Sequence, residues 1–400
     1  MRSISIYPVS LMARAVLVMI TVITPAATAV AADYKPAICA IALPYAGRPI
    51  YQEQAVLPSA ELKLGAVFDT LTSERLDTAA MQAMQFTKAH GMTAAVGSQE
   101  GMWQTTKVVG NATAPMRFYW ASAGKALTAT VVMQLVEEGK LSLDRPISRW
   151  IADFPNNDAI TIDHLLTHTA GVFSANEDLV VRKTPRYRSS DESIAIAKRH
   201  GPMFCPGQQW RYSNTGYEML GKIIEEVEGK PYGEVIKLRI AGPLHLTTLR
   251  ALAPAEIPAD VAELAPTRSD DPAMSPSWGN AAGNVVSSAA DMVTFWHALL
   301  TAKLLNKENT MKLFEHLYPM FDNGTFYGRG VMLYSFVDQG VTTTWLGHSG
   351  GASGVKAVVT FSPAKNAFVA VALTGDGSAE ATANLLFKQL LQPVLSTTNR

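Results

Sequence analysis

The sequence has little cysteine, no excess of charge of either sign and no basic cluster. Its 400 residues include 34 Lys and Arg against 34 Asp and Glu, so the formal net charge is zero. Binding to nucleic acid depends on a positively charged surface, which this composition does not predict. We therefore expect the partner to be a small molecule or a peptide, and not a nucleic acid.

Long apolar runs are also missing beyond the first 31 residues. No later stretch approaches the roughly 20 consecutive apolar residues of a transmembrane helix. Near the start, Arg2 and Arg14 precede the short apolar run 15–23, and the small-residue stretch 26–32 contains the A-x-A pattern Ala29-Val30-Ala31. These features are typical of a cleaved signal peptide, so we predict that residues 1–31 are a leader and that the mature protein is periplasmic or secreted.

Cysteine occurs only at Cys39 and Cys205. An oxidising compartment would permit a disulfide between them, but two cysteines do not establish one from sequence, so the pairing stays open. Cys39 follows Pro36-Ala37-Ile38, a poor match to a lipoprotein cleavage box, so we do not expect a lipid anchor.

Apolar residues are abundant, at 48% of the chain, which is enough for a large core. Strand-like runs gather near both chain ends, and helical patterns fill the middle. Strands are expected at 92–98, 102–110, 341–347, 355–361 and 368–373, and helices at 74–89, 162–167, 215–228 and 379–391. We predict an α/β sheet domain built from residues 32–143 and 283–400, with a helical domain, 144–282, inserted in it.

Two local signals complete this outline. Ser288-Ala-Ala-Asp291 predicts a capping box for a helix reaching Leu300. The Pro- and Ala-rich segment 33–70 has no clear periodicity, so we assign it no structure or role.

The segment 118–139 carries the first candidate site. A short aromatic run leads into a helix that is apolar on nearly every face and stops at Gly139, as a buried helix does. Ser122 and Lys125 lie three residues apart at its start, so their side chains share one face. A lysine desolvated by burial can take the proton of a serine hydroxyl, which makes the serine a nucleophile. The pattern alone also fits an N-cap serine beside a solvated lysine.

Two other patterns resemble known functional sites. His164 and His168 have the i, i+4 spacing of a zinc-binding helix, but Leu165 stands where such a motif has its glutamate and no third ligand is evident, so we expect no metal. Residues 347–351 match the G-x-S-x-G elbow of α/β-hydrolases. That elbow should enter a helix and be followed by Asp and then His, whereas a β-rich run follows here and His348 is the last histidine. Ser349 is therefore a poor nucleophile candidate.

Three motifs in order make a more specific pattern. They are SxxK at Ser122 and Lys125, YSN at Tyr212-Ser213-Asn214, and HSG at His348-Ser349-Gly350. Together they resemble the signature of serine β-lactamases and penicillin-binding proteins, and the YSN form is similar to the branch of class C β-lactamases and D-Ala-D-Ala carboxypeptidases. The stretches 165–171 and 206–207 also resemble that family. The resemblance spans roughly residues 90–375 and implies an antiparallel sheet flanked by helices, the β-lactamase/transpeptidase-like fold.

The resemblance also implies a role for each motif residue, in a reaction that needs no cofactor. Ser122 would attack a carbonyl to form an acyl-enzyme, and Lys125 and Tyr212 would transfer the protons. Asn214, with the HSG residues His348, Ser349 and Gly350, would bind the substrate. The backbone N–H groups of Ser122 and Gly351 would form the oxyanion hole.

The substrate is open at this level. Carboxypeptidase, D-aminopeptidase, β-lactamase and esterase share these motifs, and a binding module that keeps the fold without turnover is the competing class. The chain departs from β-lactamases in one place, since they usually carry Lys where His348 stands. We expect His348 to add charge to carboxylate recognition only in mild acid, unless it stays neutral and only donates a hydrogen bond.

Overall fold

The computed structural model describes residues 36–109, 117–265, 274–375 and 377–390. Residues from Ala37 onward belong to one compact unit. The predicted leader, 1–31, lies outside the described residues, and the domain boundaries at 144 and 282 stay a prediction. Within the described ranges, no helix has the length and apolar character needed to cross a membrane.

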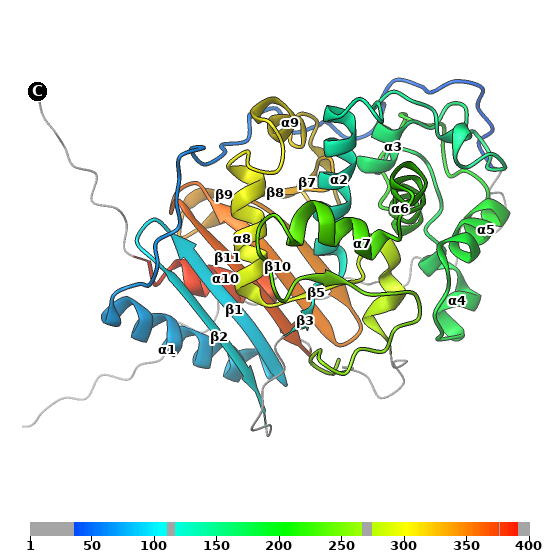
Figure 1. The fold of residues 1–400 in the computed structure, drawn as a ribbon. Coiled ribbons are helices and arrows are strands. Elements are labelled where there is room, and N and C mark those ends of the chain that lie inside the picture. The colour runs from blue at the N-terminus through cyan, green and yellow to red at the C-terminus, as the bar shows by residue number, and fades with distance from the viewer. Residues whose placement is uncertain (1–35, 110–116, 266–273, 376, 391–400) are drawn as a thin grey trace, which may run out of the picture. The chain divides into compact units, whose positions relative to one another are not determined.

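The largest element of the described chain is an antiparallel sheet of eight strands, in the order β2-β1-β11-β10-β9-β8-β7-β6 (Figure 1). Strands from the two chain ends meet in its middle, where Gly91 of β1 lies opposite Thr374 of β11. The strands are β1 (Gly91–Ser98), β2 (Met102–Val108), β6 (Tyr318–Pro319), β7 (Thr325–Tyr327), β8 (Met332–Asp338), β9 (Val341–Ala352), β10 (Val355–Ser362) and β11 (Ala367–Thr374). The predicted antiparallel sheet flanked by helices is confirmed.

Helices cover both faces of the central strands, so these strands are buried on both sides. Side chains alternate between the faces of a strand. Ala94 and Val96 of β1 therefore pack with α1 (Thr70–Thr87) and α10 (Ala379–Phe387). Ala95 points the other way, into the larger core that includes α8 (Ala289–Leu300).

The predicted apolar helix is α2 (Lys125–Glu137), and every residue from Lys125 to Met133 is buried in it. Ser122 lies just before it, in the 3₁₀ turn η1 (Ala121–Gly124). A helix this apolar must be covered on all sides. One of the elements that cover it is α6 (Asn214–Glu228), the helix that begins at the last residue of the YSN motif.

The predicted insert, 144–282, is largely helical in its described part, shown mainly in green in Figure 1. Besides α6 it contains η2 (Ile147–Arg149), α3 (Ile162–Leu166), η3 (Ala175–Glu177), α4 (Leu179–Lys183), α5 (Ser190–His200), α7 (Tyr232–Ile236), η4 (Lys237–Ala241) and η5 (Pro276–Ala282). The prediction of an all-helical insert is wrong at β4 (Arg250–Ala251). This short strand pairs with β5 (Val285–Ser287), which also pairs with β3 (Phe118–Tyr119).

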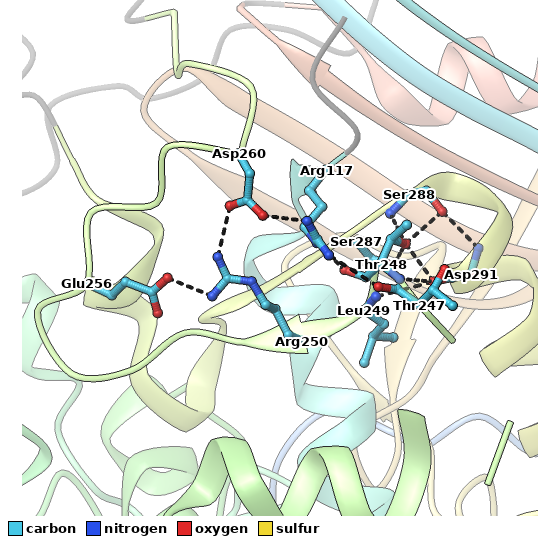
Figure 2. Close-up of polar contacts among 10 residues, drawn as sticks. All are labelled: Arg117, Thr247, Thr248, Leu249, Arg250, Glu256, Asp260, Ser287, Ser288 and Asp291. Atoms are coloured by element: carbon cyan, nitrogen blue, oxygen red, sulfur yellow. Dashed lines mark hydrogen bonds and ion pairs between the residues drawn. The ribbon is translucent and has the colours of Figure 1, made fainter. Parts of the chain in front are cut away.

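Polar contacts fasten the chain around β4 to the segment that leads into Ser122 (Figure 2). Arg117 donates to the carbonyl oxygen of Thr248 at 2.7 Å and forms an ion pair with Asp260. Arg250 bridges Asp260 and Glu256, at 2.9 and 2.6 Å. Exposed ion pairs contribute little stability singly, so the main effect of this network is to fix the path of the loop.

The predicted capping box of α8 forms only in part. Ser288 accepts a hydrogen bond from the Asp291 N–H, as expected of an N-cap. The Asp291 carboxylate does not return the bond. It accepts instead from the backbone N–H groups of Thr248 and Leu249, at 2.7 and 3.2 Å (Figure 2). The Ser288 N–H donates instead to the Thr248 hydroxyl. The Asp291 carboxylate is therefore available to bind the backbone of Thr248 and Leu249.

Cys39 and Cys205 form a disulfide across 166 residues of sequence. It joins an extended segment near the start of the described chain to the loop that precedes the YSN motif. Backbone hydrogen bonds run along the same contact, from Leu43 N to Pro206 O and from Ala46 N to Gln208 O, both at 2.8 Å. The disulfide therefore restrains the loop that leads to Tyr212.

Replacing both cysteines by serine should lower the melting temperature. A cross-link that closes so long a loop removes conformational freedom mainly from the unfolded chain, and losing a native disulfide costs about 2–5 kcal/mol. Thermal melts with and without a thiol reductant would measure the effect. Reductant should lower the native melting temperature toward that of the double variant and leave the variant unchanged. Equal melting temperatures for oxidised native protein and double variant would contradict this.

Candidate active site

The Lys125 amine is the most constrained polar group of the candidate site. Its side chain is fully buried. Nζ lies 3.3 Å from Ser122 Oγ, and it donates to Asn214 Oδ1 and to the backbone oxygen of Ala282, both at 2.7 Å. Three segments far apart in the sequence therefore converge on one nitrogen atom.

This environment favours the uncharged amine. Burial lowers the pKa of Lys125 well below its usual value, and the nearby carboxyl of Glu218 offsets this only in part. A neutral amine has two N–H donors and one lone pair. Because Asn214 and Ala282 accept the two donors, the lone pair is left for the Ser122 hydroxyl.

Asn214 is held in place by its neighbours at the start of α6. Ser213 caps this helix by accepting from the Gly216 N–H. The Asn214 N–H donates to Ser174 Oγ at 2.9 Å, and its amide Nδ2 donates to Asn176 at 3.0 Å. These contacts orient Asn214 so that its oxygen faces the lysine.

Tyr212 lies in a cluster of aromatic residues beside the lysine. Lys125 Nζ is 4.9 Å from the centre of the Tyr212 ring, and the His168 ring is 4.2 Å from it. Burial raises the pKa of Tyr212, and a hydrogen bond with the Ser122 hydroxyl opposes that shift in part. Tyr212 is thus a neutral phenol at physiological pH, so between the two groups the lysine is the better proton acceptor.

The third motif lies inside β9, which passes directly beside the turn that carries Ser122. A Cβ atom at Gly350 would be 2.1 Å from the Trp120 carbonyl oxygen and 3.1 Å from Ser122 N. Any side chain there would push the strand away from the turn. This contact explains why the third motif ends in glycine, and it brings Gly351 to the wall of the same cavity as Ser122.

His348 does not reach that cavity. It is fully buried, with Nε2 3.1 Å from the Tyr327 hydroxyl and Nδ1 2.6 Å from the Ser349 oxygen. Burial, with the nearby Lys125, lowers the pKa of His348 to about 3. The expectation that His348 becomes charged in mild acid is therefore wrong, because the desolvation of a fully buried ring opposes its protonation. The neutral, hydrogen-bonding alternative agrees with the structure.

Ser349 is also turned away from the cavity wall. Its hydroxyl contacts Met332 Sδ at 3.6 Å. β9 continues to Ala352 and places this hydroxyl against β8, and the role of Ser349 in substrate binding stays a prediction. The same strand geometry rules out an α/β-hydrolase elbow, since no helix follows Ser349.

The two histidines weighed as zinc ligands have separate structural roles. His164 Nδ1 accepts from the Thr161 N–H and completes a capping box at the start of α3. That helix ends at Leu166, so His168 is not on it, and its backbone has a positive φ of 60°. His168 Nδ1 instead accepts from the Ser213 N–H at 3.2 Å, which steadies the YSN motif.

A cavity of about 560 Å³ opens beside Ser122. Its walls combine aromatic and small residues with three arginines and one carboxyl group. The described lining is Tyr119, Ala121, Ser122, Ala175, Asn176, Val181, Arg182, Pro185, Arg186, Arg188, Ser193, Asn214, Glu218, Met274, Trp278, Gly279, Ala282, Gly283, Gly351, Ala352 and Ser353. The motifs alone did not point to Glu218 or Asn176. Glu218 could have been found, because it follows Asn214 by four residues on a predicted helix and so shares its face.

Proteins with similar sequences or structures agree with this geometry. PbpX of Bacillus subtilis (strain 168), which is named as a penicillin-binding protein, is 32% identical over 62% of this chain and 62% of its own length. The chain thus spans about three fifths of that relative.

Two solved structures share the fold. A D-stereospecific amidohydrolase from Streptomyces sp. has a TM-score of 0.65 and 26% identity, over 80% of this chain and 98% of that one. A penicillin-binding protein from Bacillus halodurans has a TM-score of 0.65 and 28% identity, over 77% and 96%.

The sequence model of the family described as Beta-lactamase matches residues 76–392, a stretch that contains all three motifs and both ends of the sheet. The chain belongs to the β-lactamase family of serine hydrolases.

Proposed function

We propose that this protein is an exported serine hydrolase that cleaves amide or ester bonds of small substrates built on D-amino acids, through an acyl-enzyme on Ser122. The observation that carries the proposal is the buried Lys125 amine, with its lone pair directed to a hydroxyl 3.3 Å away. The alternative interpretation of SxxK is an N-cap serine beside a solvated lysine. Such a lysine would be exposed, whereas Lys125 is fully buried.

Acylation follows from the contacts of these groups. Lys125 takes the Ser122 proton, and Oγ attacks the substrate carbonyl. The N–H groups of Ser122 and Gly351 stabilise the resulting oxyanion. The leaving amine or alcohol receives a proton through Tyr212, whose raised pKa keeps it a donor. Water then cleaves the ester of Ser122 by the reverse proton path.

The third motif favours amides and esters over β-lactams. A permanent positive charge at this position would help to hold a substrate carboxylate, and His348 is neutral and buried instead. The similarity to an amidohydrolase named as D-stereospecific supports the preference for D-residues. Export is supported by the leader pattern and by the disulfide, which is rare in cytosolic proteins.

A substrate panel tests the proposal. Purified mature protein would be assayed with p-nitrophenyl esters, D- and L-amino acid amides, D-Ala-D-Ala peptides and a cephalosporin. We expect hydrolysis of esters and D-amides and little of the cephalosporin. If no substrate is turned over and a fluorophosphonate does not label the protein, it is a binding module.

Replacing Ser122 by alanine should reduce kcat by about 10⁴-fold or more, because the nucleophile is lost. Ser349→Ala is the matched control and should reduce it far less, since this hydroxyl contacts Met332 and no base. Mass spectrometry with a slow substrate should find the acyl adduct on the peptide containing Ser122. An adduct on Ser349 would overturn the assignment.

Lys125→Arg should be nearly as inactive as Lys125→Ala, with a loss of about 10²–10⁴-fold in kcat. Guanidinium stays protonated and so cannot accept the serine proton. Stopped assays on both variants, after thermal melts to confirm folding, would show this. Substantial activity in the arginine variant would mean that only positive charge is needed, and Tyr212 would become the base.

The ratio of kcat/KM for a carboxylate-bearing substrate to that for a neutral ester should stay constant between about pH 5 and 7, around the ordinary histidine pKa. The His348 pKa of about 3 lies below this range. Both substrates depend equally on Lys125, so its titration cancels in the ratio. A ratio that falls with rising pH near 6.5 would show that His348 titrates and selects substrates.

A further inference from the structure

Glu218 is a buried carboxyl group on the cavity wall that the acyl-transfer chemistry does not use. Among the described residues that line the cavity, it is the only one with a carboxyl group. Its side chain is 6% exposed. It lies on α6 four residues after Asn214, so it shares the face of Asn214 one turn, or about 5.4 Å, further along the helix.

The contacts of Glu218 come from polar groups without charge. Asn280 Nδ2 donates to its Oε2 at 3.0 Å, and the Asn280 amide also donates to the Arg188 backbone oxygen. Hydroxyls of Ser190 and Ser193, on α5, lie close enough to stabilise its anion. Lys125, whose amine influences Glu218 through space, makes its own hydrogen bonds with other groups.

Burial outweighs these contacts and raises the pKa of Glu218 to about 8. Without a cation beside it, much of the carboxyl is therefore protonated at neutral pH. A buried carboxyl of this kind becomes an anion when a positive group binds next to it, and the pair then forms charge-assisted hydrogen bonds.

We propose that Glu218 binds the free α-ammonium group of the substrate, next to the scissile bond held by Ser122 and Asn214. The proposal rests on the proposed function and narrows it from D-amino acid derivatives in general to those with an unblocked amine. Glu218 is then a specificity-determining residue, and the protein is an aminopeptidase or amino-acid amidase in preference to a carboxypeptidase.

Three arginines on the cavity wall oppose a cationic group, so a bound ammonium must contact Glu218 directly, and only one of these arginines is paired with a carboxylate of the described residues. The Arg186 guanidinium is paired with Glu192 at 2.6 Å. Arg182 and Arg188 donate to backbone oxygens, of Asn176 and Thr184, at 3.3 and 3.0 Å. Tyr119, Met274 and Trp278 provide an apolar wall for the substrate side chain.

Two other roles must be separated from this one. Glu218 could simply join α6 to α5 and η5, or it could act on the basicity of Lys125, whose pKa it raises. Both roles would change turnover of every substrate alike, whereas an ammonium site affects only substrates with a free amine. The test therefore compares two substrates that differ only at the amine.

The experiment uses D-phenylalanine p-nitroanilide and its N-acetyl derivative at pH 7, with a neutral p-nitrophenyl ester as a third substrate. Native protein should prefer the free amine. Glu218→Gln, which keeps size and most hydrogen bonding, should lose about 10- to 100-fold in kcat/KM on the free amine, mainly through KM, and less than about threefold on the other two. Glu226→Gln removes an exposed carboxylate from the same helix and should change none of them.

Each result has a clear meaning. Equal losses on all three substrates in Glu218→Gln, or a native enzyme that prefers the acetylated anilide, would overturn the proposal. If the native protein hydrolyses none of the three, the proposed function itself fails.

If Glu218→Gln does not fold, the ammonium site is tested by inhibition of ester hydrolysis in the native protein. D-phenylalaninol should inhibit at least about tenfold more strongly than N-acetyl-D-phenylalaninol. Equal inhibition by the two would again overturn the ammonium site.

Discussion

The site depends on one constraint, a primary amine that is fully buried. Each N–H of Lys125 needs an acceptor, because an unpaired polar group inside a protein is costly. The acceptors come from Asn214 at the start of α6 and from Ala282 at the end of η5. The start of α2, the YSN motif and the end of the insert are therefore fixed relative to one another by a single nitrogen atom. The same desolvation that requires these partners also makes the amine a base.

The sheet contributes mainly by letting its backbone come close. β9 can pass against the turn of Ser122 because Gly350 has no side chain. His348 lies on the same strand, where its buried, neutral ring contacts the Tyr327 hydroxyl. In this chain the third motif thus shapes the cavity through backbone and packing, and the charged side chains of the cavity wall, Glu218 and the arginines, lie on the helical side.

Much of the fold was readable from local patterns. Strand-like, β-rich runs located β1, β10 and β11, and the all-apolar run located α2, because most residues of these elements are buried. The strands β6 to β8 and the short β4 were missed, since β8 has mixed burial and strands of two or three residues show no period.

In the site, too, local motifs could be predicted from the sequence, whereas contacts between distant residues could not. Motif order indicated Ser122, Lys125, Tyr212 and Asn214 as a group. The burial of His348 was not readable, since it depends on Tyr327 and Lys125, which are distant in sequence. The disulfide was equally hidden, because only the fold brings Cys39 to Cys205.

The position of β1 between β2 and β11 has a consequence for biogenesis. β1 is made early, yet β11, which pairs with it along its whole length, is the last described strand to leave the ribosome. Pairing across so much sequence is slow, and until it occurs the nascent chain lacks both β9 and the strands that support it. Ser122 and Lys125 are thus translated long before an oxyanion hole can exist. The topology itself keeps a reactive hydroxyl inert while the chain is still being synthesised.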